Sequence, residues 1–360
     1  MLEKKDYLAS AAPHDYSVTG TNVDLTSTEK IMDDFLAQSG NQVNEKAEVT
    51  YLYFGIKEQE KNKLTIFPEN ERKVLPKSIF LVFSQATYKQ LTGKDLNLAS
   101  NQVGLYSKSK TLKDQKSLSF NGQTYQIQDD INDFIKGKVP NIFTIIVSDY
   151  NYLVVPDMDV FKESIKGTAT TQATYIGVNV KDPTHDAKKN SDLLDQMTDK
   201  ETQQLAGHTT GVSQSYLTAN SQYDTEGMLN GFVGGTFFIG IFLSIIFMLG
   251  TVLVIYYKQI SEGYEDRERF VILQKIGLDD LQVKQTIRKQ VLTVFFLPLI
   301  FAFIHLAFAY HMLSLIVRII GVFNPSLMLV VTIIVCGVFF LAYVLVFALT
   351  SRSYRRIVSM

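Results

Sequence analysis

The stretch MLNGFVGGTFFIGIFLSIIFMLGTVLVIYY, residues 228–257, decides the class of this 360-residue chain. Its 30 residues carry no charged side chain, and Glu226 and Lys258 are the nearest charges on either side. About 20 apolar residues suffice to cross the hydrocarbon core of a bilayer. A core helix of a soluble protein rarely continues so long without a charge. We therefore predict that residues 229–257 span a membrane.

Two further stretches have the same character. Residues 290–317 and 319–351 contain no Asp, Glu, Lys or Arg, and Arg318 separates them. The dipeptide Asn324-Pro325 is typical of a turn, so we place the second and third spans at about 291–317 and 327–349. Because ionisable groups inside spans mark ion paths and proton relays, their absence disfavours an ion channel or a proton-coupled transporter built from these helices.

The charges of the chain are divided unevenly. Residues 1–227 hold 30 of the 36 acidic residues and 24 of the 35 basic ones, a net charge of −6, whereas residues 228–360 have a net charge of +5. Short runs rich in Val, Ile, Phe, Tyr and Thr predict strands at 49–56, 78–84, 143–147 and 174–180. Helices are expected at 30–36, 86–91 and 192–205. The fold class is therefore an α+β extracytoplasmic domain, 1–227, followed by an all-α membrane block, 228–360, of three transmembrane helices.

Positive charges close to the spans predict the orientation. The loop 258–289 has seven Lys and Arg, and the tail 352–360 has three Arg and no acid, whereas the connection between the last two spans has only Arg318. This pattern places loop and tail in the cytoplasm and residues 1–227 outside the cell membrane. A cytosolic domain with inverted spans is the alternative, and the arginine tail opposes it. Residues 1–15 lack the apolar core of a signal peptide, so we expect an upstream span in a longer protein.

The loop 258–289 has the pattern of a helix, a glycine turn and a second helix. Acidic residues between Glu262 and Glu268 suit a helix start. Gly277 suits a helix end in the left-handed conformation, and Asp279 or Asp280 can cap the next helix. One interpretation is an amphipathic hairpin at the lipid headgroups. The other is a docking element for a cytoplasmic partner, which the mixed charge of the loop favours.

The sequence offers little support for catalysis or for metal binding. It contains no G-x-x-x-x-G-K-[ST], no H-E-x-x-H and no G-x-S-x-G. A single cysteine, Cys336, excludes a disulfide framework and a cysteine-based zinc site. We expect no catalytic residue, no cofactor, no metal and, given the acidic domain, no nucleic-acid partner. Gly231 and Gly235 form a G-x-x-x-G pair, which predicts close packing of another helix.

Several of these segments resemble one family. The chain is similar to the C-terminal part of an FtsX-like ABC transporter permease of the MacB superfamily, and the run Phe295–Met312 is similar to its Bce-like branch, named for bacitracin efflux. The family order is span, extracytoplasmic domain, span, cytoplasmic coupling loop, span, span. The matching residues are Glu268-Arg269-Phe270, Leu273-Gln274-Lys275-Ile276-Gly277, Asp279-Asp280-Leu281 and Gln290–Leu299.

The resemblance implies a function and a set of partners. A separate ABC ATPase subunit would bind ATP and dock on the loop, and the loop residues expected to carry this contact are Phe270, Leu273, Gly277, Asp279, Asp280 and Leu281. Further partners would be the remaining permease half, a sensor histidine kinase, membrane lipids and a peptide or lipid-linked substrate. The function would be antimicrobial-peptide resistance. The alternative is a non-transporting FtsX-like protein that signals across the envelope or regulates a wall hydrolase.

Overall fold

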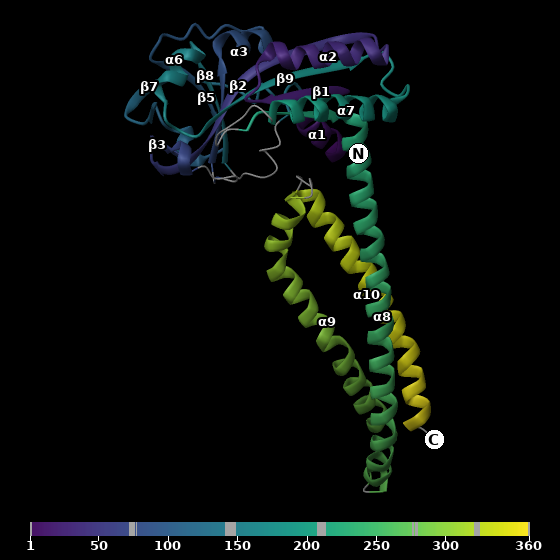
Figure 1. The fold of residues 1–360 in the computed structure, drawn as a ribbon. Coiled ribbons are helices and arrows are strands. Elements are labelled where there is room, and N and C mark those ends of the chain that lie inside the picture. Colours follow the sequence, from purple (N-terminus) through teal and green to yellow (C-terminus); the bar gives the residue numbers. More distant parts are fainter. Residues whose placement is uncertain are drawn as a thin grey trace. The chain divides into compact units, whose positions relative to one another are not determined.

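The computed structural model describes residues 2–71, 76, 78–140, 149–206, 214–275, 277, 280–319 and 325–358. The chain divides into two compact units, Met1–Asn230 and Gly231–Met360. The first unit is a mixed sheet with helices, and the second consists of long helices (Figure 1). The fold class expected from the sequence, an α+β domain followed by three long apolar helices, is confirmed.

Ten strands of the described residues form one sheet, in the order β10-β1-β9-β2-β3-β6-β7-β5-β8-β4. They are β1 (Tyr16–Thr21), β2 (Val43–Glu60), β3 (Lys63–Ile66), β4 (Ser78–Ser84), β5 (Gln102–Ser107), β6 (Ser117–Phe120), β7 (Gln123–Asp130), β8 (Asp149–Val155), β9 (Thr170–Val180) and β10 (Tyr216–Ser221). The helices of this unit are α1 (Leu2–Ala11), α2 (Leu25–Ser39), the short η1 (Glu69–Glu71), α3 (Gln85–Thr92), α4 (Lys110–Lys113), α6 (Met158–Ser164) and α7 (Ala187–Ala206).

The 18-residue strand β2 organises the sheet. One part of it pairs with β9, and its later residues pair with both β3 and β4. The pairing with β4 closes seven strands, from β2 through β3, β6, β7, β5 and β8 to β4, into a ring. The strands β9, β1 and β10 extend the sheet from the other part of β2. This extension ends at β10, whose last residue directly precedes the first long helix.

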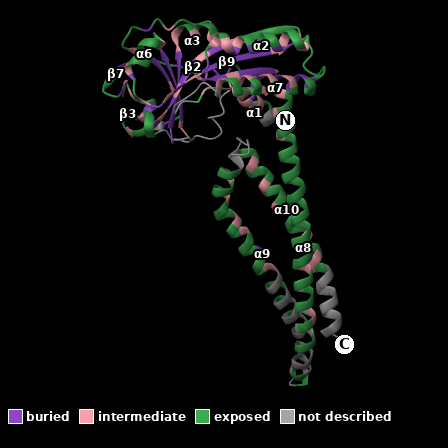
Figure 2. Cartoon of the chain, in the orientation of Figure 1, coloured by how far each residue is buried: buried purple, intermediate pink, exposed green. Residues whose placement is uncertain are grey.

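Side-chain alternation along β2 separates two cores, as expected for a strand buried on both faces. Leu52, Phe54 and Ile56 join a cluster drawn from all seven strands of the ring, so this cluster fills its interior. The ring of Phe54 lies 5.7 Å from that of Phe80. On the opposite face Tyr51 lies 5.4 Å from Phe83. The strands of this unit are accordingly the most buried part of the chain (Figure 2).

A third core joins the sheet extension to two helices. Met32 and Phe35 of α2 pack with Ile176 and Val178 of β9 and with Leu194 of α7. The carboxylate of Asp24 accepts a hydrogen bond from the Ser27 amide and so caps α2. The predicted helices 30–36, 86–91 and 192–205 lie within α2, α3 and α7. The predicted strands 49–56, 78–84 and 174–180 lie within β2, β4 and β9, whereas 143–147 falls outside the described residues.

The second unit is built from α8 (Gln222–Lys275), α9 (Asp280–Ile319) and α10 (Pro325–Val358). These three helices are long and apolar enough to cross a membrane, over Gln222–Lys258, Phe296–Ile316 and Ser326–Ala348. Most of the described residues of these helices are exposed (Figure 2). Large apolar side chains are among them, and that of Phe308 is 84 % exposed. Contiguous apolar surface of this extent is not found on soluble monomers, and a bilayer accounts for it.

One sequence-based prediction, a helix start near Glu262, is wrong. The acidic residues near Glu262 suggested that a separate helix begins there, after the first span. Instead α8 continues without a break to Lys275. No Pro falls between Lys258 and Lys275, and Gly263 does not end the helix, because a helix that leaves the bilayer already has its nucleus and propagation continues at little cost.

The interior of the strand ring gives a stability prediction. Phe54→Ala should lower the free energy of unfolding of the domain by about 3–5 kcal/mol, because it removes a fully buried ring from a packed core. Val160→Ala, at a site that is 61 % exposed, should change it by less than about 0.5 kcal/mol. Pulse proteolysis of the full chain in detergent across a urea series measures both. Equal urea midpoints for the two variants would contradict the assignment of Phe54 to the core.

Candidate functional site

The first turn of α8 is held by a partly buried hydrogen-bonded cluster. The Ser221 hydroxyl accepts a hydrogen bond from the Asp224 amide at 3.0 Å and donates one to the Asp224 carboxylate at 2.8 Å. The Ser191 hydroxyl of α7 lies 2.7 Å from that of Ser221 and also contacts the Asp224 carboxylate. Both serines are 2 % exposed. Ser221 therefore caps α8, and the cap is joined to α7.

Two segments near the N-terminus bind the same turn. The Gln222 amide donates to the carbonyl of Asp15 at 2.9 Å. The Asn220 side-chain amide donates to the carbonyl of Ala11 at 3.0 Å, at the end of α1, and the Thr225 hydroxyl donates to the Asn220 side chain at 2.8 Å. The start of α8 is thus fixed by α1, α7 and β10 together. We call Ser191, Asn220, Ser221, Gln222 and Asp224 the α8 junction.

Hydrogen-bonded strands connect the α8 junction to the ring of seven strands. Ser221 of β10 pairs with Tyr16 of β1, and Tyr16 pairs on its other side with Val178 of β9. Val178 in turn pairs with Lys46 of β2. These four residues form one row across four hydrogen-bonded strands. A displacement at the start of α8 therefore has a direct path to the strand that closes the ring.

His14 secures the segment that follows α1. Its side chain is 4 % exposed, and its Nδ1 lies 2.7 Å from the Tyr175 hydroxyl of β9. A Cβ on Gly177 would lie 2.4 Å from that nitrogen, so the imidazole occupies space that only glycine leaves open. Burial lowers the pKa of His14, although Glu45 and Asp15 partly oppose the shift. The sequence showed His14 only as one half of an isolated His-Asp pair.

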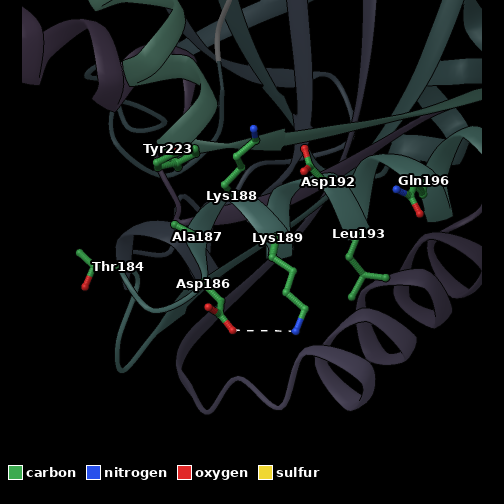
Figure 3. Close-up of a pocket in the computed structure, with 9 residues that line it drawn as sticks. All are labelled: Thr184, Asp186, Ala187, Lys188, Lys189, Asp192, Leu193, Gln196 and Tyr223. Carbon is green, nitrogen blue, oxygen red and sulfur yellow. Dashed lines mark ion pairs between the residues drawn. The ribbon is translucent and has the colours of Figure 1, made fainter.

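An open pocket lies beside the junction (Figure 3). Its volume is about 690 Å³, and it is formed by the start of α7 and by one residue of α8. Lys189 and Asp186 point toward each other across 3.9 Å, and Tyr223 projects from α8. The lining residues are Thr184, Asp186, Ala187, Lys188, Lys189, Asp192, Leu193, Gln196 and Tyr223. Two Lys and two Asp give this pocket no net charge, so it selects for neither cations nor anions.

Acidic side chains crowd the outer face of α7. Burial raises the pKa of Asp195, and the carboxylates of Asp224, Asp199 and Asp192 raise it further. Among the described residues, no three or more His, Cys, Asp or Glu side chains are grouped so that they could hold a metal ion. The hydrogen bonds among Ser191, Ser221 and Asp224 connect α7 to the first turn of α8.

The loop residues expected to dock a partner lie on two helix ends around a turn. Phe270 and Leu273 belong to the last turns of α8, whereas Asp280 and Leu281 begin α9. Gly277 lies between the helices with φ of +104°, a conformation that side chains with a Cβ rarely adopt. Asp279 falls outside the described residues. The backbone therefore brings the described members of this set to one helix–turn–helix.

The glycine pair of α8 presents an open face. Gly231 and Gly235 lie one helical turn apart, and a Cβ on either would meet no heavy atom within 4 Å. The sequence predicts a packing role for this pair, whereas the α8 junction was not predicted. The signal for it was present, since Ser221-x-x-Asp224 directly before an apolar run has the form of a capping box.

Parts of the chain are similar to ABC transporter permeases of Bacillus subtilis (strain 168). The ABC transporter permease protein YxdM is 35 % identical over 77 residues, 21 % of this chain and 12 % of that protein. The uncharacterized ABC transporter permease YvcS is 30 % identical over 121 residues, 34 % of this chain and 18 % of that protein. The bacitracin export permease protein BceB is 28 % identical over 160 residues, 43 % of this chain and 22 % of that protein.

These similarities are partial. The aligned segments cover less than a quarter of each permease, and no family model matches the chain. A crystal structure of a proposed lipoprotein from Bacillus anthracis aligns with 49 % of this chain and 92 % of its own, at 10 % identity and a TM-score of 0.28, which does not establish a shared fold. The permease similarities support an ABC permease family and, with the three apolar helices, a location in the membrane.

The α8 junction gives a local stability prediction. Ser221→Ala removes the acceptor for the Asp224 amide and a donor to its carboxylate. Loss of an N-cap costs about 1 kcal/mol, so hydrogen exchange at the first turn of α8 should quicken by roughly fivefold. Tyr223→Ala, in the same turn but 48 % exposed, is the matched control. Exchange mass spectrometry of the full chain in detergent measures both, and unchanged protection in Ser221→Ala would refute the cap.

The buried imidazole gives a pH prediction. Because the folded state lowers the pKa of His14 below its usual 6.5, the unfolded chain binds the proton more readily. The contribution of His14 is therefore fully present above about pH 6.5 and is lost as the pH falls toward the lowered value. His14→Gln should flatten the fall in unfolding free energy between about pH 7.5 and 5.5.

Val160→Ala serves as the control for this measurement, because Val160 is 61 % exposed and carries no titratable group. It should leave the pH dependence of wild type unchanged. Urea unfolding of the full chain, followed by circular dichroism at several pH values, gives the slopes. Identical slopes for wild type and His14→Gln would show that His14 does not titrate with folding.

Proposed function

We propose that this chain is the C-terminal part of an ABC transporter permease that couples ATP hydrolysis by a separate subunit to movement of an extracellular domain. The observation that carries the proposal is the continuity of α8. Its 54 residues correspond to a rod of about 81 Å, whereas the hydrocarbon core of a bilayer is about 30 Å thick. One helix therefore suffices to join the α8 junction to a turn beyond the opposite membrane face.

The proposed orientation follows the positive charges. Seven Lys and Arg between Lys258 and Lys289, and three Arg after Ser351, place the hairpin and the tail in the cytoplasm. Residues 1–227 are then extracellular. The side chains Asp224 and Lys275, near the two ends of α8, lie on opposite sides of the membrane in this arrangement.

The proposed mechanism treats the chain as a lever. The ATPase docks on the helix–turn–helix through Phe270, Leu273, Gly277, Asp279, Asp280 and Leu281, and ATP is bound by that subunit. Its closure displaces the hairpin, α8 transmits the displacement, and the α8 junction passes it to α7 and to the row Ser221, Tyr16, Val178 and Lys46. Spans without Asp, Glu, Lys or Arg suit a lever better than a hydrophilic pathway.

The substrate and the further partners belong to the same proposal. The similar protein BceB is named a bacitracin export permease. The resemblance of the Phe295–Met312 segment to the Bce-like branch favours a role in antimicrobial-peptide resistance. The substrate would be a peptide or its lipid-linked target outside the cell. A remaining permease half and a sensor histidine kinase complete the proposed assembly, in which Gly231 and Gly235 offer a helix-packing face.

Gly277 provides the decisive test. Gly277→Val should abolish stimulation of the ATPase subunit while leaving membrane insertion intact, because a β-branched residue cannot adopt φ of +104° without strain. Gly250→Val is the matched control, since Gly250 is helical and a Cβ there meets no heavy atom within 4 Å. ATP hydrolysis by the co-expressed ATPase in proteoliposomes is measured. Wild-type stimulation by Gly277→Val would reject the coupling role of the turn.

A further inference from the structure

Residues 11–15, which join the end of α1 to β1, bind the start of α8 through their backbone carbonyls. The carbonyl of Ala11 accepts a hydrogen bond from the Asn220 side chain at 3.0 Å, and that of Ala12 accepts one from the Gln222 side chain at 3.4 Å. The carbonyl of Asp15 accepts a third from the Gln222 amide at 2.9 Å. We call residues 11–15 the connecting segment. Because Gln222 is the first residue of α8, this segment supplies acceptors where the helix begins.

The connecting segment is also attached to β9. The Asp15 amide donates to the Asn179 side chain at 3.1 Å, and the Val180 amide donates to the Asp15 carboxylate at 2.8 Å. The third attachment is the contact of His14 Nδ1 with the Tyr175 hydroxyl at 2.7 Å. The connecting segment is therefore hydrogen-bonded both to β9 and to the start of α8.

His14 gives this segment a group that changes charge near neutral pH, because histidine ordinarily titrates in that range. Its ring is closely packed. The side chain is 4 % exposed, and the ring centroid lies 5.7 Å from that of Tyr175. On another side, a Cβ on Gly177 would lie 2.4 Å from Nδ1. A positive charge in such a place loses most of its hydration, so an imidazolium favours an arrangement in which the ring reaches water.

The charged groups around the ring do not fully offset this loss of hydration. Burial lowers the pKa of His14, and among the described residues the carboxylates of Glu45 on β2 and of Asp15 oppose the shift without cancelling it. The Glu45 carboxylate also accepts a hydrogen bond from the Asn179 side chain at 3.2 Å. From β9 the ring meets Tyr175, whose pKa is raised by burial. This phenol therefore stays neutral and offers no negative charge to an imidazolium.

We propose that protonation of His14 opens the connecting segment and thereby loosens the first turn of α8. The open segment withdraws its three carbonyls from the start of the helix, whereas the cap by Ser221 remains, so the turn is loosened rather than unfolded. In the open state the imidazole is in water and binds its proton near the usual pKa of about 6.5, so opening becomes more favourable as the pH falls through that value. The inference concerns the first unit alone and does not depend on an ATPase.

Hydrogen exchange tests the inference. The full chain in detergent is compared at about pH 7.5 and about pH 5.5, and each rate is corrected for the intrinsic pH dependence of amide exchange. The protection of the peptide 220–225 should fall about five- to tenfold at the lower pH. Addition of about 1 M urea should leave this change nearly unaltered, because local opening exposes little surface, whereas global unfolding depends strongly on urea.

Two variants assign the effect to His14. His14→Gln carries no charge at either pH, so the protection of the peptide should be the same at both. Gly177→Ala places a methyl group about 2.4 Å from Nδ1 and should displace the ring, so at about pH 7.5 the protection should already be as low as that of wild type at about pH 5.5. Val160→Ala, at a position that is 61 % exposed, is the control and should behave as wild type does.

Three results would overturn the inference. The first is equal protection of the wild-type peptide at both pH values. The second is a pH-dependent loss of protection that persists in His14→Gln. The third is a sensitivity to urea as large as that of the peptide 52–56 in the β2 core, which would show that the first turn of α8 exchanges only through global unfolding. The first and third results need no variant, and Gly177→Ala assigns the effect to the ring even if His14→Gln fails to fold.

Discussion

The hydrogen bonds between Ser221, Asp224 and Ser191 hold the start of α8 within the first unit. The first turn of any helix has amides without intrahelical partners, and in α8 the Ser221 hydroxyl supplies one of them. The same hydroxyl and carboxylate are bound by Ser191 of α7. The first turn of α8 is therefore hydrogen-bonded to α7 within the first unit.

The sheet connects the α8 junction to the ring of seven strands. The strand β2 belongs both to the extension that ends at β10 and to the ring closed by β4, so a rigid hydrogen-bonded surface leads from the α8 junction to the interior packed by Phe54 and Phe80. Short connections and interdigitated rings make such a core resist bending. We expect the ring to move as one body when the start of α8 is displaced.

The sequence predicted the parts of the fold that depend on local pattern. The three spans, the turn near Gly277 and the helix at 192–205 follow from periodicity and from the absence of charge. The ring could not be predicted, because it is closed by pairings between strands far apart in the chain, such as β3 with β6 and β5 with β8, and local patterns do not determine such pairings. The α8 junction needed Ser191 and Ser221 to be adjacent in space although 30 residues separate them.

The charged side chains at the two ends of α8 match the dipole of the helix. A helix carries a partial positive charge at its start and a partial negative charge at its end. Asp224 lies in the first turn of α8 and Lys275 in the last, so each end has a side chain of the favourable sign, and each such charge contributes about 0.3–1 kcal/mol. Burial raises the pKa of Asp195, and the carboxylates of Asp224, Asp199 and Asp192 raise it further, so the acidic residues near the start of α8 also repel one another. This repulsion offsets part of the favourable interaction of Asp224 with the helix dipole, and the hydrogen bonds from Ser191 and Ser221 to the Asp224 carboxylate hold it in the first turn.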